Sequence, residues 1–218
     1  MILVVTGLLK EAAVVAGAGV RTVSGGGRSA LLRERLEAAL APGDVTHVLS
    51  FGLAGALQPG LSLGDLFAAA TVRDAERRFF PDPAWTARLV ALTGARPADL
   101  AGVDAAADSP QAKASLRLRT GAALVDMESH LAAAAAHARE LPFAVLRAVS
   151  DLPDDSLPPA ALAGMRADGA IDAAAVALRL LRDPRQLPAL LRMAGGSSAA
   201  FASLRRAAAA AGAGLGAP

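Results

Sequence analysis

The sequence predicts an α/β fold: one three-layer α/β/α domain with a central mixed, twisted sheet, followed by a helical C-terminal extension. Short apolar runs alternate with longer runs of helical periodicity, which is typical of a mostly parallel or mixed sheet with helices on its faces. The length of 218 residues suits one such domain. Several strands end in glycine-rich turns, as they do where open α/β sheets build their sites.

The elements follow in chain order. We predict strands at residues 2–6, 20–24, 45–50, 65–72, 122–126 and 143–149. We predict helices at about residues 28–40, 84–93, 110–119, 128–139, 168–182, 185–194 and 198–211. The chain divides into a domain at 1–182 and a basic helical extension at 183–218.

Composition narrows the class of protein. Hydrophobic residues make up 54% of the chain, but no apolar run approaches the ~20 residues of a membrane span. There is no cysteine, and the chain opens directly on a predicted strand, so we expect a cytoplasmic protein. With 3% aromatic residues and a net charge of +2, stacking on a nucleic acid is not expected. The three histidines do not form a ligand set, so we expect no metal.

Glycine-rich turns follow three strands, at Thr6-Gly7, at Ser24 to Gly27 and at Ser50 to Gly55. Backbone amides at Gly25, Gly26 and Gly27, together with Arg28, could hold an anion. The alternative is that these glycines serve only as tight turns. The spacing fits neither a Walker loop nor a dinucleotide fingerprint.

Two acids, Glu128 and Asp151, stand where apolar strands end. Buried charge needs a partner or a chemical role, so we look for the site here. The alternatives are local: either acid could cap a helix, and Glu11 could be an ordinary first-turn acid.

Five collinear segments resemble the purine nucleoside phosphorylase and uridine phosphorylase superfamily, and most of all its methylthioadenosine/S-adenosylhomocysteine nucleosidases. They are Met1 to Glu11, Ser24 to Arg28, Ser50 to Asp65, Val125 to Glu128 and Pro142 to Asp151. The resemblance implies a nucleoside phosphorylase-like catalytic domain that breaks a purine N-glycosidic bond without a cofactor. It also implies a homo-oligomer, with a dimer expected.

The resemblance assigns roles to the acids. Asp151 matches the general acid that donates to N7 of the purine, for which it must hold a proton, and Ser150 matches the residue that orients it. Glu128 matches the acid that takes the ribose hydroxyls, and Met127 would pack on the ribose. We therefore expect adenine release to be lost in Asp151→Asn and retained in Lys113→Ala.

The remaining site residues follow from the same resemblance. Glu11 matches the acid that activates water, and Arg147 an arginine that holds the site together. The segment with Gly52, Ala54 and Gly55 would lie along the substrate. The acids Asp126, Asp154 and Asp155 are expected to be structural or solvated.

Two segments depart from the nucleosidases. Asp104 to Asp108 has no aromatic residue to hold adenine, and Pro158 to Ala161 replaces a later phenylalanine. Ser50 stands where some phosphorylases carry an arginine, so the phosphate clamp is incomplete and water is favoured. Phosphate as a co-substrate, with a soluble nucleoside such as methylthioadenosine, stays open, as does a non-catalytic purine-binding protein.

The extension resembles that of the hopanoid-associated phosphorylases, or adenosylhopane nucleosidases, at Leu180 to Arg192. This resemblance implies a lipid-linked adenosyl substrate, adenosylhopane. Arg185 and Arg192 share one face of the predicted helix, opposite Leu187 and Leu191. The helix either docks on the domain or makes a peripheral contact with anionic lipid, at the inner face of the membrane.

Overall fold

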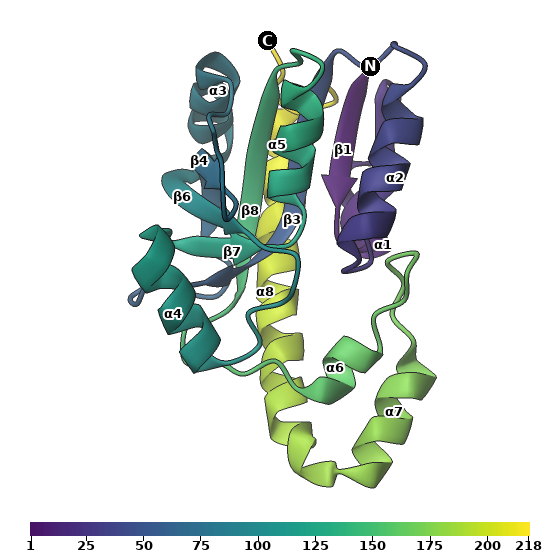
Figure 1. Ribbon diagram of the computed structural model, residues 1–218, viewed down its shortest axis with the longest axis vertical. Coiled ribbons are helices and arrows are strands. Elements are labelled where there is room, and N and C mark those ends of the chain that lie inside the picture. Colours follow the sequence, from purple (N-terminus) through teal and green to yellow (C-terminus); the bar gives the residue numbers. More distant parts are fainter.

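The computed structural model describes residues 1–218, arranged as a sheet with helices on both faces (Figure 1). The strands are β1 (Ile2–Thr6), β2 (Val20–Ser24), β3 (His47–Ala56), β4 (Leu66–Arg73), β5 (Arg78–Phe79), β6 (Arg96–Gly102), β7 (Leu124–Asp126) and β8 (Phe143–Asp151). The helices are α1 (Leu9–Val15), α2 (Ser29–Leu40), α3 (Pro83–Thr93), α4 (Pro110–Thr120), α5 (Ser129–His137), α6 (Pro159–Ala163), α7 (Ala173–Arg182) and α8 (Leu187–Ala211), with a short 3₁₀ turn at Pro184–Gln186.

The sheet is mixed, as the sequence predicts. Strands β2, β1, β3 and β8 run parallel to one another, whereas β7 pairs antiparallel with β3, and β4 pairs antiparallel with β8. Strand β6 joins β4 to β7 in parallel pairings. The pairings β3–β8–β4–β6–β7–β3 return to their start, so these five strands close on themselves.

Two apolar cores cover the two faces of the sheet. One lies between the sheet and helices α2 and α5, and contains Val145 and Val149 of β8. The other lies on the opposite face, under α1, α3 and α8, and contains Leu146 of β8 and Trp85 of α3. The side chains of β8 alternate between these cores because successive residues of a strand point to opposite faces. The three-layer α/β/α prediction is therefore confirmed.

Helices α3 and α4 begin and end on signals that the sequence carries. Asp82 and Ser109 each accept a hydrogen bond from a backbone N–H of the first turn, and a proline follows each cap. Gly94 and Gly121 end the two helices in the left-handed conformation, which glycine adopts without a steric cost.

Four helices and strands are not predicted from the sequence. Helix α1 is only seven residues long, α6 only five and β5 only two, so they are too short to show a periodicity. Strand β6 was missed because Pro97 and Asp99 are poor strand residues. Proline is tolerated there because β7 pairs only with residues 100–102 of β6, so Pro97 has a single neighbouring strand.

The C-terminal helices differ from the prediction. The helix predicted from residue 168 begins at Ala173, and the two helices predicted at 185–194 and 198–211 are one helix, α8, which starts after the 3₁₀ turn. Gly195 and Gly196, which suggested a break, lie inside α8. Tertiary packing overrides the low helix propensity of the pair. The division of the chain at residue 182 stays a prediction.

The segment that contains α6, α7 and the first turns of α8 projects below the sheet (Figure 1). Helix α7 has no buried residue. Five leucines of this arm, which we define as residues 159–194, are exposed: Leu162, Leu178, Leu181, Leu187 and Leu191. No helix of the chain is both long and apolar enough to span a bilayer.

Candidate active site

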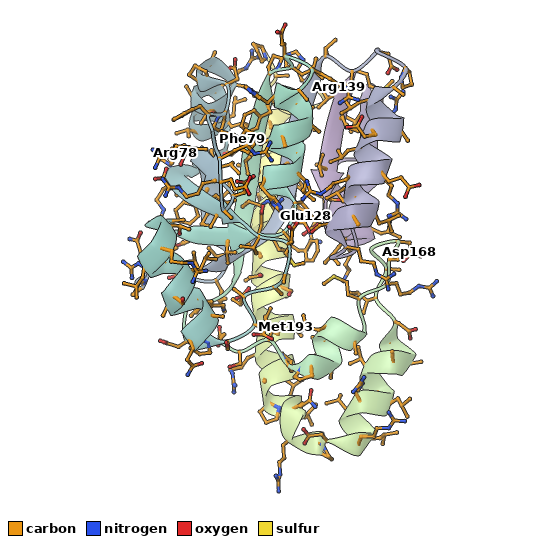
Figure 2. The ribbon with its side chains drawn as sticks, viewed as in Figure 1. Arg78, Phe79, Glu128, Arg139, Asp168 and Met193 are labelled. Atoms are coloured by element: carbon orange, nitrogen blue, oxygen red, sulfur yellow. The ribbon has the colours of Figure 1, made fainter.

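The predicted site residues gather where β1, β3 and β8 end and α5 begins. Glu128 lies at the centre of the molecule, at the lower end of α5 (Figure 2). The carboxyl ends of parallel strands meet at one edge of a sheet, which is where α/β folds place their ligands. Five of the polar or charged side chains gathered there are buried: Glu11, Ser50, Glu128, Arg147 and Asp151.

Arg147 of β8 holds one half of the site together. Its Nε lies 2.6 Å from Oδ2 of Asp126, and its Nη2 lies 3.5 Å from Oε2 of Glu128. Nη2 also donates to the hydroxyl of Ser50 at 2.6 Å, and Nη1 donates to the carbonyl of Leu53 at 3.2 Å. This guanidinium is 1% exposed, so its position is fixed by partners rather than by water.

Asp126 and Ser129 belong to this buried cluster, a part that sequence reasoning missed. Asp126 accepts from the backbone N–H of Ser129 at 3.0 Å, and its Oδ2 also contacts the Ser129 hydroxyl. Asp126 is therefore structural, as predicted, but it is buried rather than solvated and is the ion-pair partner of Arg147. Its place two residues before Glu128, within the matched motif, was the available signal.

Glu11 connects α1 to β3. Its Oε2 accepts from the backbone N–H groups of Gly7 and Leu8, both at 2.8 Å, and its Oε1 accepts from the N–H of Leu53 at 2.8 Å. The bond to Leu8 is the one expected of a first-turn acid, but the bond to Leu53 crosses to another strand. Burial raises the pKa of Glu11, against the opposing influence of Arg147 and the three backbone donors.

Glu128 does not cap the helix that it precedes, because its side chain makes no capping hydrogen bond. Burial raises the pKa of Glu128 to about 8; Arg147 opposes this, and the nearby carboxylates of Asp126 and Glu11 add to it. The site therefore contains three buried acids around one guanidinium. A group with a raised pKa at a strand end is a functional-site candidate.

Asp151 is the last residue of β8, and no helix starts there, so it is not a helix cap either. Its Oδ2 accepts from the hydroxyl of Ser150 at 2.9 Å. Its Oδ1 contacts the Nζ of Lys113, which comes from α4 and is 1% exposed. Both carboxylate oxygens are thus held by defined donors.

Lys113 is not remote from the site, as its choice as a control substitution assumed, because it is the buried ion-pair partner of Asp151. One signal in the sequence pointed to this residue. The chain has 22 basic residues, of which only Lys10 and Lys113 are lysines.

The glycines of β3 let these side chains approach the backbone. A Cβ on Gly52 would lie 2.6 Å from Oε1 of Glu11 and 2.7 Å from Nη1 of Arg147. A Cβ on Gly55 would lie 2.9 Å from Oδ1 of Asp151. Between them, the carbonyl of Ala54 accepts from the Ser150 hydroxyl at 3.3 Å.

The site has two halves, one around Arg147 and one around Asp151, and Gly52 and Gly55 show how far apart they lie along the sheet. In the register of β3 against β8, Gly52 pairs with Arg147 and Gly55 with Asp151. At ~3.3 Å per residue, the two halves are about 10 Å apart along the strand.

The turn at Gly25 to Arg28 is not a free anion cradle. The N–H groups of Gly25, Gly26 and Arg28 donate to the carbonyls of Thr6, Gly7 and Gly25. A Cβ on Gly26 would lie 2.3 Å from the carbonyl oxygen of Arg166, so the turn packs against that loop instead. Arg28 is exposed. Of the four residues that were predicted to hold an anion, only Gly27 has a backbone N–H that takes no part in these hydrogen bonds.

Met127 lies beside the same turn. A Cβ on Gly27 would come 3.9 Å from Cε of Met127 and 2.7 Å from Sδ of Met165. Met165, which lies after α6, is a neighbour that the sequence did not suggest. The two methionines give this side of the site an apolar wall.

The two segments without the family's aromatic residues are adjacent to each other. The N–H of Leu157 donates to the carbonyl of Asp108 at 2.8 Å. Asp104 is instead engaged with His130 of α5, at 3.2 Å, and with Arg33 of α2, at 3.4 Å. The two segments where the resemblance expects aromatic residues near adenine are therefore adjacent loops with small side chains.

Two cavities of about 380 and 410 Å³ lie elsewhere, one beside Asp65, Arg96 and Arg206, the other beside Val14 and Arg205. Neither is lined by Glu128 or Asp151. The acids therefore share an edge of the sheet rather than one of these cavities.

A comparison with protein-family models matches residues 2–182 to the family described as the phosphorylase superfamily. No curated protein matches the sequence significantly.

Several solved structures share the fold. One is a putative methylthioadenosine nucleosidase from Weissella paramesenteroides, with 19% identity over 96% of this chain and 97% of that chain, and a TM-score of 0.62. Another is the 5′-methylthioadenosine/S-adenosylhomocysteine nucleosidase of Colwellia psychrerythraea in complex with adenine, with 17% identity over 90% and 95% and a TM-score of 0.63. A third is the corresponding Helicobacter pylori nucleosidase with a bound pyrrolidinol compound, with 17% identity over 85% and 97% and a TM-score of 0.63.

Proposed function

Because the chain belongs to the phosphorylase superfamily, and so to the nucleosidases and nucleoside phosphorylases, we propose that it hydrolyses the N-glycosidic bond of an adenosyl compound and releases adenine. The observation that carries this proposal is the pair of buried acids at one edge of the sheet, Glu128 beside Arg147 and Asp151 beside Ser150, with Arg147 and Asp151 paired to Gly52 and Gly55 of the same strand β3.

The two halves of the site suit the two ends of such a bond. Loss of a purine leaves positive charge on the ribosyl carbon, and a carboxylate near the sugar stabilises that charge. Glu128 takes this role in its ionised form, which the neighbouring guanidinium of Arg147 favours. At the other end, Asp151 delivers a proton to the purine, and Ser150 fixes the orientation of its carboxyl.

We propose that Glu11 activates the attacking water. Three backbone N–H groups hold its carboxylate, and burial raises its pKa toward the range in which a carboxylate is an effective base. Arg147 binds no substrate in this scheme. It holds Asp126, Ser50 and the region of Glu128 in fixed positions.

The charge of the site favours water over phosphate. Three buried acids surround one guanidinium, and an incoming phosphate would add to the negative charge. At the turn after β2, the N–H groups of Gly25 and Gly26 already donate to backbone carbonyls. Phosphorolysis of methylthioadenosine by the same acids is the second candidate, favoured only by the free N–H of Gly27 and the exposed Arg28.

For the 5′ substituent we propose the triterpenoid of adenosylhopane. The support is the resemblance of Leu180 to Arg192 to the hopanoid-associated enzymes, together with the small side chains at the base end and the exposed leucines of the arm. An amphiphilic substrate needs apolar surface near the site, and the arm begins eight residues after Asp151. The ratio of kcat/KM for adenosylhopane and for methylthioadenosine tests this choice.

The arm also suits a peripheral contact with the inner face of the membrane by a cytoplasmic protein. Its exposed leucines are accompanied by Arg179, Arg182, Arg185 and Arg192. Apolar side chains flanked by arginines favour an anionic bilayer surface. Co-sedimentation with vesicles that contain phosphatidylglycerol, compared with phosphatidylcholine alone, tests this, and Leu181→Gln should weaken it.

We also propose a homodimer. The support is family resemblance, and sedimentation velocity of the purified protein tests it.

The principal experiment incubates the purified protein with several 5′-substituted adenosines and measures free adenine by mass spectrometry, with and without phosphate. Adenine release without phosphate is expected, and Asp151→Asn should abolish it. Asp154→Asn, an exposed neighbour, is the matched control and should keep full activity. Release that requires phosphate would favour the second candidate. No release from any adenosyl compound, with binding retained, would favour a non-catalytic purine-binding protein.

A further inference from the structure

Lys113 is a buried cation in a cage of three acceptors. Its Nζ contacts Oδ1 of Asp151 and lies 2.7 Å from the carbonyl of Leu152 and 3.1 Å from the carbonyl of Asp155. A lysine ammonium has three N–H donors, so these contacts satisfy it completely. Removing such a side chain from water is costly, and it indicates a specific role.

Helix stability does not explain this lysine. Lys113 lies in the first turn of α4, where the helix macrodipole disfavours a cation. The rest of the chain uses arginine for its basic residues, with Lys10 as the other exception. A lysine ammonium can pass a proton along a hydrogen bond to the group that it contacts, whereas the guanidinium of arginine keeps its charge.

Asp151 by itself cannot protonate a leaving group while it is a carboxylate. Paired with an ammonium, it belongs to a unit that contains one transferable proton on the Nζ–H···Oδ1 contact. The second oxygen, Oδ2, is held by Ser150, so the carboxyl cannot rotate away from the lysine. Asp151 is the one carboxylate bonded to Lys113, which meets Asp155 only through its backbone carbonyl; the carboxylate of Asp155 accepts from the N–H of Leu152 at 2.8 Å.

We propose that Lys113 is a positioning residue that supplies the proton passed through Asp151 to the departing adenine. This inference rests on the proposed function and names a residue for its protonation step. The N-glycosidic electron pair moves onto the purine, and N7 takes a proton from the Asp151 carboxyl. That carboxyl receives its proton from Nζ as the Nζ–H bond breaks, which leaves a neutral amine. Glu11 takes one proton from the water that adds to the ribosyl carbon and releases it to solvent, and one proton from solvent restores the ammonium, so the cycle consumes one water and no net proton.

A leaving group that needs no proton separates this role from simple stabilisation. p-Nitrophenolate departs as a stable anion, so a p-nitrophenyl β-ribofuranoside with the same 5′ substituent bypasses the protonation step. We expect Lys113→Met to lower kcat for adenine release by at least about 100-fold, the usual contribution of general acid catalysis. The same variant should cleave the p-nitrophenyl riboside within about threefold of the wild-type rate. Lys10→Met, at the exposed lysine, is the matched control.

The alternative is that Lys113 only tethers the loop after β8. Equal losses on both substrates, or full adenine release by Lys113→Met, would overturn the inference. If Lys113→Met does not fold, Lys113→Arg carries the same comparison, because its guanidinium keeps the positive charge but does not give up a proton. If the wild-type protein releases adenine and either variant loses activity equally on both substrates, the role of Lys113 is refuted and the proposed function stands. If the wild-type protein cleaves neither substrate, the proposed function is refuted.

Discussion

Gly196 of α8 lies directly against the carbonyl of Ser150, at the end of β8. A Cβ built on Gly196 would be 2.1 Å from that oxygen, far closer than two atoms can approach. The long C-terminal helix therefore contacts the strand at the residue next to Asp151. Gly196, one of the two glycines that separate the two helices predicted from the sequence, is what permits this contact.

Gly196→Ala should disturb the end of β8, since either the helix or the strand must move to make room. We expect a loss of stability of about 1–3 kcal/mol, as for other overpacked sites, and reduced adenine release. Gly195→Ala is the matched control, because a Cβ there has no neighbour within 4 Å. It should stabilise the helix by up to about 1 kcal/mol. Urea unfolding followed by the fluorescence of Trp85, the single, fully buried tryptophan, measures both. Equal effects of the two substitutions would contradict the close contact.

Arg147→Met should destabilise the protein strongly. The substitution leaves Asp126, Glu128 and Glu11 buried without their guanidinium, and removing one member of a buried ion pair costs about 3–5 kcal/mol. Adding Asp126→Asn should recover part of that loss. Arg192→Met, at an exposed position, is the control. Urea titration measures the unfolding free energy of each variant. A loss below about 1 kcal/mol for Arg147→Met would show that Arg147 does not hold the cluster of acids together.

Glu128→Gln should change how stability depends on pH. Burial raises the pKa of Glu128 to about 8 in the folded protein, from 4.5 for a free side chain. The stability that the protonated carboxyl contributes is fully present below about pH 4.5 and is lost as the pH rises toward 8. The glutamine variant does not ionise, so it should gain a few kcal/mol relative to wild type between pH 5 and pH 8.

Unfolding by urea at several pH values within that window measures the difference. Glu34→Gln, an exposed acid on α2, should run parallel to wild type. A stability difference between Glu128→Gln and wild type that does not change with pH would mean that Glu128 is ionised throughout.

Gly52→Ala should impair catalysis more than folding. Its Cβ would fall within 2.7 Å of both Glu11 and Arg147 and displace them. Misplacement of reacting groups by about 1 Å costs about 100-fold in rate, and we expect kcat for adenine release to fall by that order. Gly17→Ala, where a Cβ meets nothing within 4 Å, should leave the rate unchanged. Normal activity in Gly52→Ala would argue that Glu11 is not positioned through this contact.

The secondary structure was predictable where local signals are strong. The apolar runs of β1, β2 and β8 and the capped helices α3 and α4 appear close to their predicted positions. Prediction was wrong where local signals oppose tertiary packing, as at Pro97 in β6 and at Gly195-Gly196 in α8. Pro97 fits β6 because it has a single neighbouring strand, and glycine is needed at position 196 because a carbonyl lies against it. Both conditions depend on residues that are distant in the sequence.

The sequence by itself determined the α/β class, the alternation of elements, and the positions of Glu128 and Asp151 at strand ends, because hydrophobic periodicity and turn residues act over short distances. The tertiary structure decided which charges meet. Arg147 faces Asp126, Lys113 faces Asp151, and the amides after β2 face backbone carbonyls rather than an open turn. These pairings join residues from different helices and strands, and no local pattern encodes them; they follow from the way the strands pair and the helices pack on the sheet.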